Sequence, residues 1–414
     1  MKIPRAIWMK RRGLAALIAA LDGKARFVGG AVRDTLLGLE VKDVDIATPL
    51  LPEDVMDRLT AASVKVVPTG IAHGTVTAVL PDGPIEITTL RRDVSTDGRR
   101  ATVAFSDDWK EDSARRDFTI NALSADPATL EVFDYFGGLD DLRNLRIRFI
   151  GSAHERIAED YLRIMRYFRF LARFGQEKVD DEGFAACTAA AAKLETLSRE
   201  RVADELLKLL QTEDPRFAVG KMLDAGIFEH IVEEIDKDIE LVFSRLVERE
   251  QQLQIVPTAI RRLVALLPKD PEKASRVATS LKLSKKQQKA IGERLLPGFG
   301  RDAGQPGANS SDIRAFAYRT SVDAARDVAL LFTGDGALPD MLAQLKDWQP
   351  PVFPLTGGYL IERGLKPGPV VAKTLAKIET AWIAQGFPDE KWVQKFVDDL
   401  DLTLLAGSGK PVVI

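Results

Sequence analysis

The stretch from residue 27 to residue 48 reads FVGGAVRDTLLGLEVKDVDIAT, and it decides the fold of the first part of the chain. Its first residues predict a short strand, a tight turn at Gly29-Gly30 and the start of a helix that carries Arg33. Two glycines let the backbone approach a phosphate group closely, and an arginine in the first helical turn adds donors for the same anion. A plain turn also explains a glycine pair, so the interpretation depends on the residues further along the chain.

Two carboxylates come next, in the segment Asp43-Val44-Asp45. In a strand, residues i and i+2 project from the same face, so Asp43 and Asp45 are predicted to lie side by side. Neighbouring carboxylates repel each other unless a metal ion neutralises them, and Mg²⁺ binds one or two carboxylates together with substrate phosphates. A solvated strand end is the alternative for this segment alone. Glu86, between two isoleucines on a predicted buried strand, is a third acid that needs a partner, and three acids on neighbouring strands suit a two-metal phosphoryl-transfer site.

The composition excludes several classes of protein. The chain has 414 residues, of which 45% are hydrophobic and 29% charged, as is ordinary for a globular protein. The net charge of −3 excludes a globally basic nucleic-acid-binding surface, so any nucleic acid must be bound by local patches. One cysteine, Cys187, and three histidines argue against a Cys/His zinc site. The lone cysteine suits a reducing cytoplasm, and the chain lacks the 18-residue apolar run of a membrane span.

Strand and helix patterns divide the chain near residue 150. Before it, β-branched or alternating segments predict strands, and a turn at 82–84 joins the last two of them into a hairpin. These segments are 25–28, 41–47, 64–67, 75–80 and 85–90. Residues 93–112 are polar and irregular, which predicts a mobile loop. After residue 150 the 3.6-residue periodicity of amphipathic helices dominates and predicts an all-helical remainder.

Together these segments resemble the class II tRNA nucleotidyltransferases, the bacterial CCA-adding enzymes, which with poly(A) polymerases form a branch of the polymerase-β-like nucleotidyltransferase superfamily. The resemblance runs through residues 27–206 in family order. It rests on residues 29–34, 43–48, 68–76 and 85–91, on RRDFTINA at 115–122, on GGLDDL at 137–142, on EDYLRIMR at 159–166 and on LSRERVADEL at 197–206.

The resemblance implies an α+β fold, with a small N-terminal mixed β-sheet followed by an all-helical neck, body and tail. The implied boundaries are 1–145 for the catalytic nucleotidyltransferase head, 146–220 for the neck that recognises the nucleotide base, 221–350 for the body and 351–414 for a tail that binds tRNA. The segment 197–206 is assigned a structural role in packing a helix.

The resemblance also implies roles for the candidate residues. Asp43, Asp45 and Glu86 are catalytic: the two aspartates hold the metals of a two-metal Mg²⁺ site, with Mn²⁺ as the alternative ion, and Glu86 helps to activate the attacking hydroxyl. The nucleotide-binding residues are Gly29, Gly30, Arg33, Arg116, Asp117, Asn121, Asp160, Arg163, Arg166 and Arg169. Within this set Gly29, Gly30 and Arg33 hold the triphosphate, residues 116–121 handle the ribose, and the last two arginines contact the triphosphate and the nucleotide.

Asp160 and Arg163 carry the choice of base. Their spacing places them beside each other on a helix, where an ordinary ion pair is the alternative explanation. Cytosine and adenine both present an amino donor beside a ring-nitrogen acceptor. A carboxylate accepts from the amino group, and a guanidinium donates to the ring nitrogen. Guanine and uracil present the reverse polarity, so the pair is predicted to favour C and A over G and U.

The predicted function is that of an enzyme that adds C, C and A to the tRNA 3′ end from CTP and ATP, without a nucleic-acid template, in the cytoplasm. The implied partners are CTP, ATP and the acceptor arm and 3′ end of tRNA, with no membrane and no stable protein partner. The alternatives are a poly(A) polymerase, a partial CC-adding or A-adding enzyme, and, from another class, a non-catalytic RNA-binding relative. The sequence DGRR at 97–100 replaces the usual aromatic and His-Pro pattern of the family, and this segment bears on the switch from C to A addition.

Overall fold

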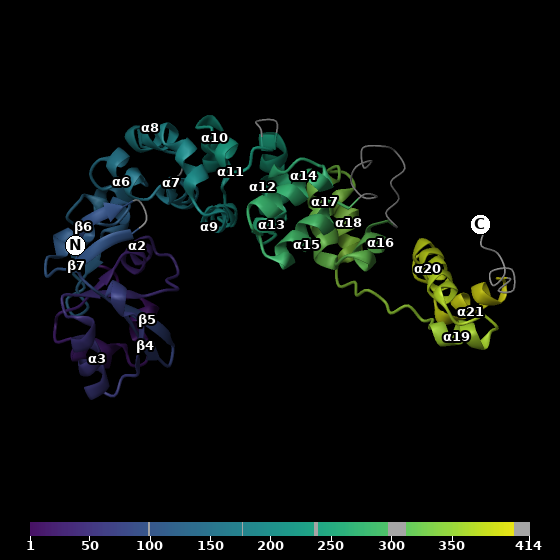
Figure 1. Cartoon of the computed structure of the whole chain (residues 1–414), viewed down its shortest axis with the longest axis horizontal. Helices are drawn as coiled ribbons and strands as arrows, with labels where there is room; N and C mark the ends of the chain where they lie inside the picture. The colour runs from purple at the N-terminus through teal and green to yellow at the C-terminus, as the bar shows by residue number, and fades with distance from the viewer. Residues whose placement is uncertain (98–99, 176, 236–238, 297–311, 401–414) are drawn as a thin grey trace. The chain divides into compact units, whose positions relative to one another are not determined.

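The structure is a computed structural model that describes residues 1–97, 100–175, 177–235, 239–296 and 312–400, with the backbone alone for residues 93–97, 100–103 and 312. The chain forms two compact units (Figure 1). Unit 1 comprises residues 1–240 together with 280–282, and unit 2 comprises residues 241–279 together with 283–414. Each unit contains a hydrophobic cluster of its own.

Unit 1 is built on a mixed seven-stranded sheet with the strand order β3-β4-β5-β2-β1-β8-β9. The strands are β1 (Arg26–Val28), β2 (Asp45–Thr48), β3 (Val66–Gly70), β4 (Thr75–Leu80), β5 (Gly83–Thr89), β8 (Ser124–Ala125) and β9 (Val132–Phe133). The predicted hairpin is present as the antiparallel pair β4–β5. The one parallel pair in this sheet, β2–β5, places Asp45 directly beside Glu86. The predicted mixed sheet is therefore confirmed, and it brings together two of the three candidate acids.

The helices of the N-terminal region of unit 1 are α1 (Leu14–Ala20), α2 (Gly30–Leu36) and α3 (Pro52–Ala61), with a short 3₁₀ turn, η1, at Ile7–Lys10.

Alternation along the strands separates the two faces of the sheet. Phe27, Ile46 and Ile87 are buried on one face. On the opposite face Val28 and Ala47 pack with Leu90 and Trp109, while Asp45 and Glu86 keep solvent-exposed side chains. The acids thus stand at the edge of a small apolar cluster.

The prediction of an irregular loop at 93–112 is wrong. Strands β6 (Arg91–Asp97) and β7 (Arg100–Phe105) form an antiparallel hairpin, and helix α4 (Trp109–Ala114) comes after it. Gly98 and Arg99, which the sequence places between these strands, lie outside the described residues. The polar composition concealed the strands. The β-branched residues in the segment, together with an Asp-Gly turn pair, favour a hairpin.

Helices make up the rest of unit 1. The elements are α5 (Gly138–Arg143), α6 (Ala153–Glu159), α7 (Leu162–Phe174), α8 (Asp181–Ala189), α9 (Arg199–Leu210), α10 (Arg216–Asp224) and α11 (Ile227–Ile231), with 3₁₀ turns η2 (Ile71–His73), η3 (Thr119–Asn121) and η4 (Ala191–Thr196). The prediction that Asp160 and Arg163 share one helix is wrong, because the chain breaks between α6 and α7. Asp160 is extended, and its Oδ1 accepts a hydrogen bond from the backbone N–H of Leu162 at 3.1 Å. A carboxylate that satisfies a free N–H at a helix start favours this break.

Gly138, the first residue of α5, lies against the backbone of the turn η3. A Cβ added at Gly138 would be 2.3 Å from the carbonyl oxygen of Thr119. Thr119 also donates its hydroxyl to Asp141 Oδ2 at 2.6 Å, so α5 and η3 are fixed to each other twice. Asn121, at the end of η3, therefore has a rigid support.

We expect Gly138→Ala to lower the free energy of unfolding of unit 1 by about 2 kcal/mol, because a methyl group has no room beside a backbone carbonyl. Urea unfolding followed by tryptophan fluorescence measures the change. Gly292→Ala in unit 2 is the control, since a Cβ there meets no atom within 4 Å. If Gly138→Ala were as stable as the parent, the contact between α5 and η3 would not be tight in solution.

Unit 2 is entirely helical in its described part. Its helices are α12 (Glu240–Gln252), α13 (Ala259–Leu266), α14 (Pro271–Ser280), α15 (Lys285–Arg294), α16 (Asp312–Arg319), α17 (Val322–Phe332), α18 (Leu338–Leu345), α19 (Gly357–Glu362), α20 (Pro369–Ala384) and α21 (Glu390–Asp398). A buried ionic network joins three of them: Arg261 of α13 donates to Glu250 of α12 at 2.5 Å and to Asp327 of α17 at 2.6 Å. A separate apolar cluster surrounds Trp382 of α20.

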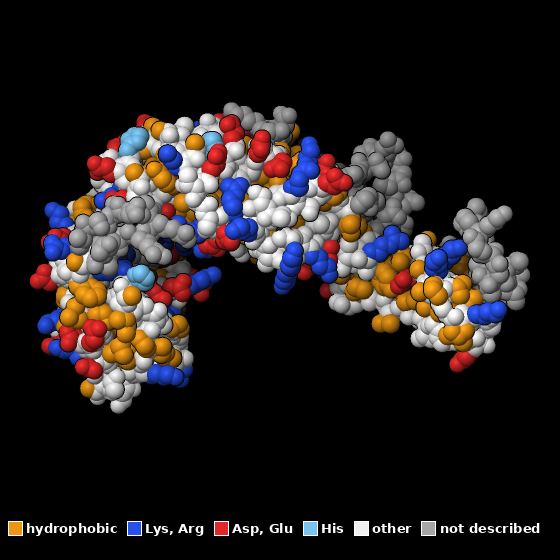
Figure 2. Space-filling model, viewed as in Figure 1, with side chains coloured by type: hydrophobic (Ala, Val, Ile, Leu, Met, Phe, Trp, Pro, Cys, Tyr) orange, Lys and Arg blue, Asp and Glu red, His pale blue; other side chains and the backbone are white. Residues whose placement is uncertain are grey.

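The surface of the molecule mixes charges of both signs. On the face drawn in Figure 2, Lys and Arg side chains alternate with Asp and Glu, and no continuous basic coat covers the described residues seen there. This pattern agrees with the net charge of −3. Among the described residues, no helix has both the length and the apolar character needed to cross a membrane.

Candidate active site

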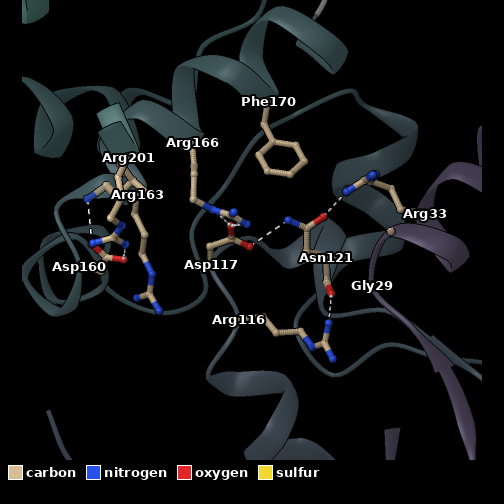
Figure 3. Close-up of a pocket in the computed structure, with 12 residues that line it drawn as sticks. Gly29, Arg33, Arg116, Asp117, Asn121, Asp160, Arg163, Arg166, Phe170 and Arg201 are labelled. Carbon is tan, nitrogen blue, oxygen red and sulfur yellow. Dashed lines mark hydrogen bonds and ion pairs between the residues drawn. The ribbon is translucent and has the colours of Figure 1, made fainter. Parts of the chain in front are cut away.

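A polar cavity of about 430 Å³ lies within unit 1 (Figure 3). Four parts of the chain form it: Gly29 with the start of α2, the segment that ends in η3, α7 with Asp160 just before it, and one side chain of α9. The lining residues are Gly29, Gly30, Arg33, Arg116, Asp117, Asn121, Asp160, Leu162, Arg163, Arg166, Phe170 and Arg201. Five arginines against two aspartates give the cavity an excess of positive charge, which favours a polyanionic ligand.

The glycine turn brings the backbone close to Arg116. Gly29 has φ of +62°, and a Cβ at this position would be 2.8 Å from Arg116 Nη1. Any side chain here would therefore be strained and would displace the guanidinium. This close approach between the backbone and a cation at the cavity wall explains the glycine at position 29, whereas a Cβ at Gly30 would meet only Arg33 Nη2, at an ordinary 3.6 Å.

Arg33 is buried at the cavity wall. Its Nε donates to Asp34 Oδ1 at 2.7 Å, and its Nη1 donates to Asn121 Oδ1. Burial lowers the pKa of Arg33, and the carboxylate of Asp34 opposes that shift. Arg33 thus supports Asn121. Its guanidinium binds Asp34 and Asn121 and also lines the cavity.

Asp117 and Asn121, which the resemblance assigns to the ribose, are hydrogen-bonded to each other at the turn η3. Asn121 Nδ2 donates to Asp117 Oδ1 at 2.9 Å, and Arg166 Nε donates to Asp117 Oδ2 at 2.7 Å. Burial acts to raise the pKa of Asp117. Arg166 and the hydrogen bonds from Asn121 and Phe118 outweigh it, so the pKa lies below the usual value. The carboxylate therefore stays ionised on the cavity wall (Figure 3).

Asp160 and Arg163 both line the cavity, but they are not an ion pair with each other. Arg201 of α9 donates to Asp160 Oδ2 at 2.6 Å. Arg163 Nη1 donates to Glu159 Oε2 at 2.5 Å and to the carbonyl of Arg156 at 2.8 Å. Each predicted base-reading side chain thus has its own support, and the intrahelical pair between them, which was the alternative explanation, is absent.

Of the two remaining arginines, the structure brings only Arg166 to the cavity. Arg169 Nε donates to Glu205 Oε2 at 2.5 Å, and its guanidinium lies 4.5 Å from the centre of the Phe170 ring. Phe170 lines the cavity and Arg169 does not. The carboxylate of Glu205, on the predicted structural helix α9, holds Arg169 in this position.

Two of the three acids, Asp45 and Glu86, lie on the sheet next to this cavity, and Asp43 lies in the segment just before β2 rather than in the strand as predicted. The parallel register pairs Asp45 with Glu86, and Asp43 stands two residues before the start of β2. Loss of water around its carboxylate raises the pKa of Asp45 although part of the side chain is exposed; the negative charges of Glu86 and Asp43 add to this, and Arg116 opposes it. The prediction that Glu86 is buried is wrong, because the adjacent Ile85 and Ile87 occupy the buried face.

The donor set fits a hard divalent cation that is completed by other ligands. Among the described residues, no three His, Cys, Asp or Glu side chains form a ready-made metal cage. Asp43, Asp45 and Glu86 nonetheless have no hydrogen bond or ion pair to a described side chain, and the charge of Arg116 offsets only part of the repulsion at Asp45. Two carboxylates with substrate phosphates and water are the ligands that Mg²⁺ prefers.

Known proteins resemble this chain over most of its length. Residues 25–148 match the family described as "Poly A polymerase head domain", and residues 178–239 match "Probable RNA and SrmB- binding site of polymerase A". The mouse protein "CCA tRNA nucleotidyltransferase 1, mitochondrial" is 32% identical over 389 residues, which cover 92% of this chain and 87% of the mouse protein. The chain belongs to the CCA-adding nucleotidyltransferase family. The "CCA-adding enzyme" of Latilactobacillus sakei is also 32% identical, over 90% of this chain and 93% of its own.

A solved structure of the CCA-adding family has the same fold. The Bacillus stearothermophilus CCA-adding enzyme, determined in complex with CTP, superposes with a TM-score of 0.73 at 28% identity, and the match covers 92% of this chain and 96% of that one. The predicted α+β class, a small mixed sheet followed by helices, is thereby confirmed. The chain is a nucleotidyltransferase.

The sequence patterns did not indicate three residues of the cavity in this CCA-adding family member: Leu162, Phe170 and Arg201. Phe170 lies among the arginines of α7, and an aromatic residue among cations is a signal for nucleotide binding that was available. Arg201 gave no local signal, because its partner Asp160 is 41 residues away. The helix assigned to packing alone therefore contributes one cation to the cavity.

Proposed function

We propose that this enzyme adds C, C and A to the 3′ end of tRNA from CTP and ATP, without a nucleic-acid template. One observation carries the proposal: a cavity lined by five arginines, with Asp160 and Arg163 at one end, lies beside the Asp45–Glu86 pair. The cavity offers sites for a triphosphate and a base, and the adjacent acids offer the chemistry. The named relatives favour CCA addition over other products.

In the proposed reaction the tRNA 3′-hydroxyl attacks the α-phosphorus and pyrophosphate leaves. Asp43 and Asp45 would hold Mg²⁺, which when bound neutralises charge on the phosphates. Glu86 would accept the proton of the attacking hydroxyl, a role that its register position beside Asp45 supports. Arg116, with Gly29 and Gly30, contacts the triphosphate, while Asp117 and Asn121 orient the ribose. Arg33 and Arg166 act mainly by holding Asn121 and Asp117.

In this proposal the base is chosen by Arg163 and Asp160, through the donors and lone pairs that their protein partners leave unused. Two hydrogen bonds use both hydrogens of Arg163 Nη1, and one Nη2 hydrogen goes to the carbonyl of Arg115 at 3.2 Å. Among the described residues, no hydrogen bond uses the Nε–H or the other Nη2–H of Arg163, so these two donors remain for the ring nitrogen of a base. The remaining lone pairs of Asp160 accept from the amino group of C or A. G and U would face both groups with the wrong polarity.

A single assay tests the function. The protein is incubated with tRNA that lacks its 3′ CCA, with each nucleoside triphosphate alone and with CTP plus ATP, and the products are sequenced. CCA supports the proposal. CC alone, a single A, or a long A tract would each identify a partial or poly(A)-adding enzyme, and no addition would favour an RNA-binding relative without activity.

We propose further that residues 1–145 act as head, 146–220 as neck, 221–350 as body and 351–414 as a tRNA-binding tail, and that the enzyme works in the cytoplasm. The lone buried Cys187 supports a reducing compartment. Cell fractionation with an antibody against the full chain tests the location, since some relatives carry mitochondrial names.

The hairpin β6–β7 is expected to matter more for A than for C. Removal of residues 94–102 should lower the rate of A addition about tenfold or more and leave C addition within about twofold, because a loop element that must move for one substrate need not limit the other. Single-turnover assays with tRNA ending in CC, and with tRNA lacking CCA, compare the two steps. Equal rates in the parent and the shortened enzyme would contradict this expectation.

A further inference from the structure

We propose that Asp112 is a positioning residue: through one carboxylate it joins the base of the β6–β7 hairpin to Arg116 and so holds that guanidinium in place for the incoming nucleoside triphosphate. This inference rests on the function proposed above, and it assigns a role to a residue that lies outside the cavity. Its support comes from the contacts of Asp112, from the weak hold on Arg116 and from the place of Arg116 between the cavity and the acids.

Asp112 is a buried acid on α4 with two different partners. Its relative exposure is 8%. Oδ1 accepts a hydrogen bond from the backbone N–H of Arg91, the first residue of β6, at 3.1 Å. Oδ2 lies 3.6 Å from Arg116 Nη2, one helical turn further along the chain. A buried carboxylate is costly unless it is paired, so both contacts compensate the same charge.

Arg116 is held more loosely than the other arginines of the cavity wall. Its Nη1 donates to the carbonyl of Asn121 at 3.4 Å, and its ion pair with Asp112 spans 3.6 Å. By comparison, Arg166 donates to Asp117 at 2.7 Å and Arg201 to Asp160 at 2.6 Å. The position of Arg116 therefore depends on weak contacts, of which Asp112 is the one that carries the opposite charge.

The place of Arg116 makes that position important. Its guanidinium lies against Gly29 on the cavity wall, and its charge acts on Asp45 at the neighbouring acid group. A triphosphate that reaches from the cavity to metals on Asp43 and Asp45 must pass this cation. A small shift of a guanidinium that binds phosphate changes substrate affinity more than protein stability.

The hairpin end of the connection is also fixed. The Nη1 of Arg91 donates to the carbonyl of His73 at 2.6 Å, and a Cβ on the next residue, Gly74, would be 2.8 Å from the ring of Phe105 at the end of β7. Asp112 therefore links two parts of the chain, the anchored base of the hairpin and the cation beside the cavity.

Steady-state kinetics of the full-length enzyme test the inference. Asp112→Asn keeps an oxygen that can accept from the Arg91 N–H but removes the charge that faces Arg116. We expect the KM for CTP and for ATP to rise about tenfold, with kcat and the KM for tRNA within about twofold, since the lost contact acts on ground-state nucleotide binding. Glu111→Gln is the matched control: Glu111 is the preceding acid on α4, and its carboxylate accepts from the Ser106 hydroxyl beyond β7 at 2.7 Å rather than pairing with Arg116. It should keep the parent constants.

A double-mutant cycle separates positioning from general stability. Arg116→Ala should raise the nucleotide KM at least as much as Asp112→Asn, and adding Asp112→Asn to Arg116→Ala should raise it no further, because the two residues then act as one unit. Additive effects, or a loss of thermal stability with an unchanged KM, would overturn the inference. If Asp112→Asn does not fold, Asp112→Ser serves instead, since its hydroxyl also accepts from an N–H and carries no charge, and it must show the same rise.

These experiments distinguish a failure of the role of Asp112 from a failure of the proposed function. If the parent enzyme adds no nucleotide to tRNA, the function itself fails. If the parent adds CCA and Asp112→Asn matches it in every constant, only the role of Asp112 fails.

Discussion

Replacement of Asp45 by alanine is expected to lower the rates of C and A addition by about 10³-fold or more while tRNA still binds. Asp45 has Glu86 directly beside it and Asp43 two residues before it, and no described cation pairs with any of them. Loss of one metal-binding carboxylate removes several kcal/mol of transition-state stabilisation, which corresponds to about this factor. Single-turnover incorporation of labelled CTP and ATP gives the rates, and filter binding gives the tRNA affinity.

Asp54→Ala is the matched control for this variant. Asp54 is an exposed aspartate on α3 of the same unit, so its loss changes the charge of the unit equally without touching the acids. It should add nucleotides at the parent rate. If Asp45→Ala also retained near-normal turnover, the assignment of the chemistry to β2 and β5 would be wrong.

The second large effect concerns the choice of base. Asp160→Ala should lower kcat/KM for CTP about a hundredfold and reduce the preference for CTP over UTP, because it removes the acceptor for the amino group and also the clash with a uracil carbonyl. Arg163→Ala should weaken CTP use by about tenfold through loss of the donor to the ring nitrogen. The ratio of kcat/KM for CTP to that for UTP, measured for each variant, is the decisive quantity.

The control for these variants is Asp204→Ala. Asp204 is an exposed acid on α9 that pairs with Lys208 at 2.6 Å, so its loss breaks an ion pair in the same unit outside the cavity. It should keep the parent ratio. Should Asp160→Ala and Arg163→Ala both keep the parent ratio as well, base choice must reside in other cavity residues, with Arg201 the next to test.

Local patterns predicted the parts of the site whose geometry depends on a single element or on strand alternation. The strand–glycine–helix interpretation of residues 27–36 needed only turn chemistry. The inclusion of residues 116–121 in the site came from the family resemblance, and the hydrogen bond between Asn121 and Asp117 was not predicted. The sheet position of Glu86 was implied by alternation between two isoleucines. Its exposure was not, because whether the second face of a strand is covered depends on elements elsewhere in the chain.

The contacts that sequence patterns do not reveal are those between distant segments. The pair Arg201–Asp160 joins α9 to the break between α6 and α7. That break is stabilised by a hydrogen bond from the Leu162 backbone N–H to the Asp160 carboxylate, which periodicity does not encode. The polar composition of residues 91–105 suggests irregular structure, whereas the β-branched residues among them correctly favour the strands of the hairpin β6–β7. The ion pair that holds Arg169 against Glu205, away from the cavity, likewise depends on how α7 packs on α9.

The position of β1 in the sheet has a consequence for how the protein is made. Val28 pairs with Asp45 on one side and with Ser124 on the other, so one edge of β1 stays open until residue 124 has been synthesised, 96 residues later. At ribosomal rates of about 5–20 residues per second, that interval lasts roughly 5–20 s. An unpaired strand edge is a template for association with other chains during this time. We therefore expect the nascent chain to need a chaperone over this window, and slowing of translation between codons 45 and 124 to lower the yield of soluble enzyme.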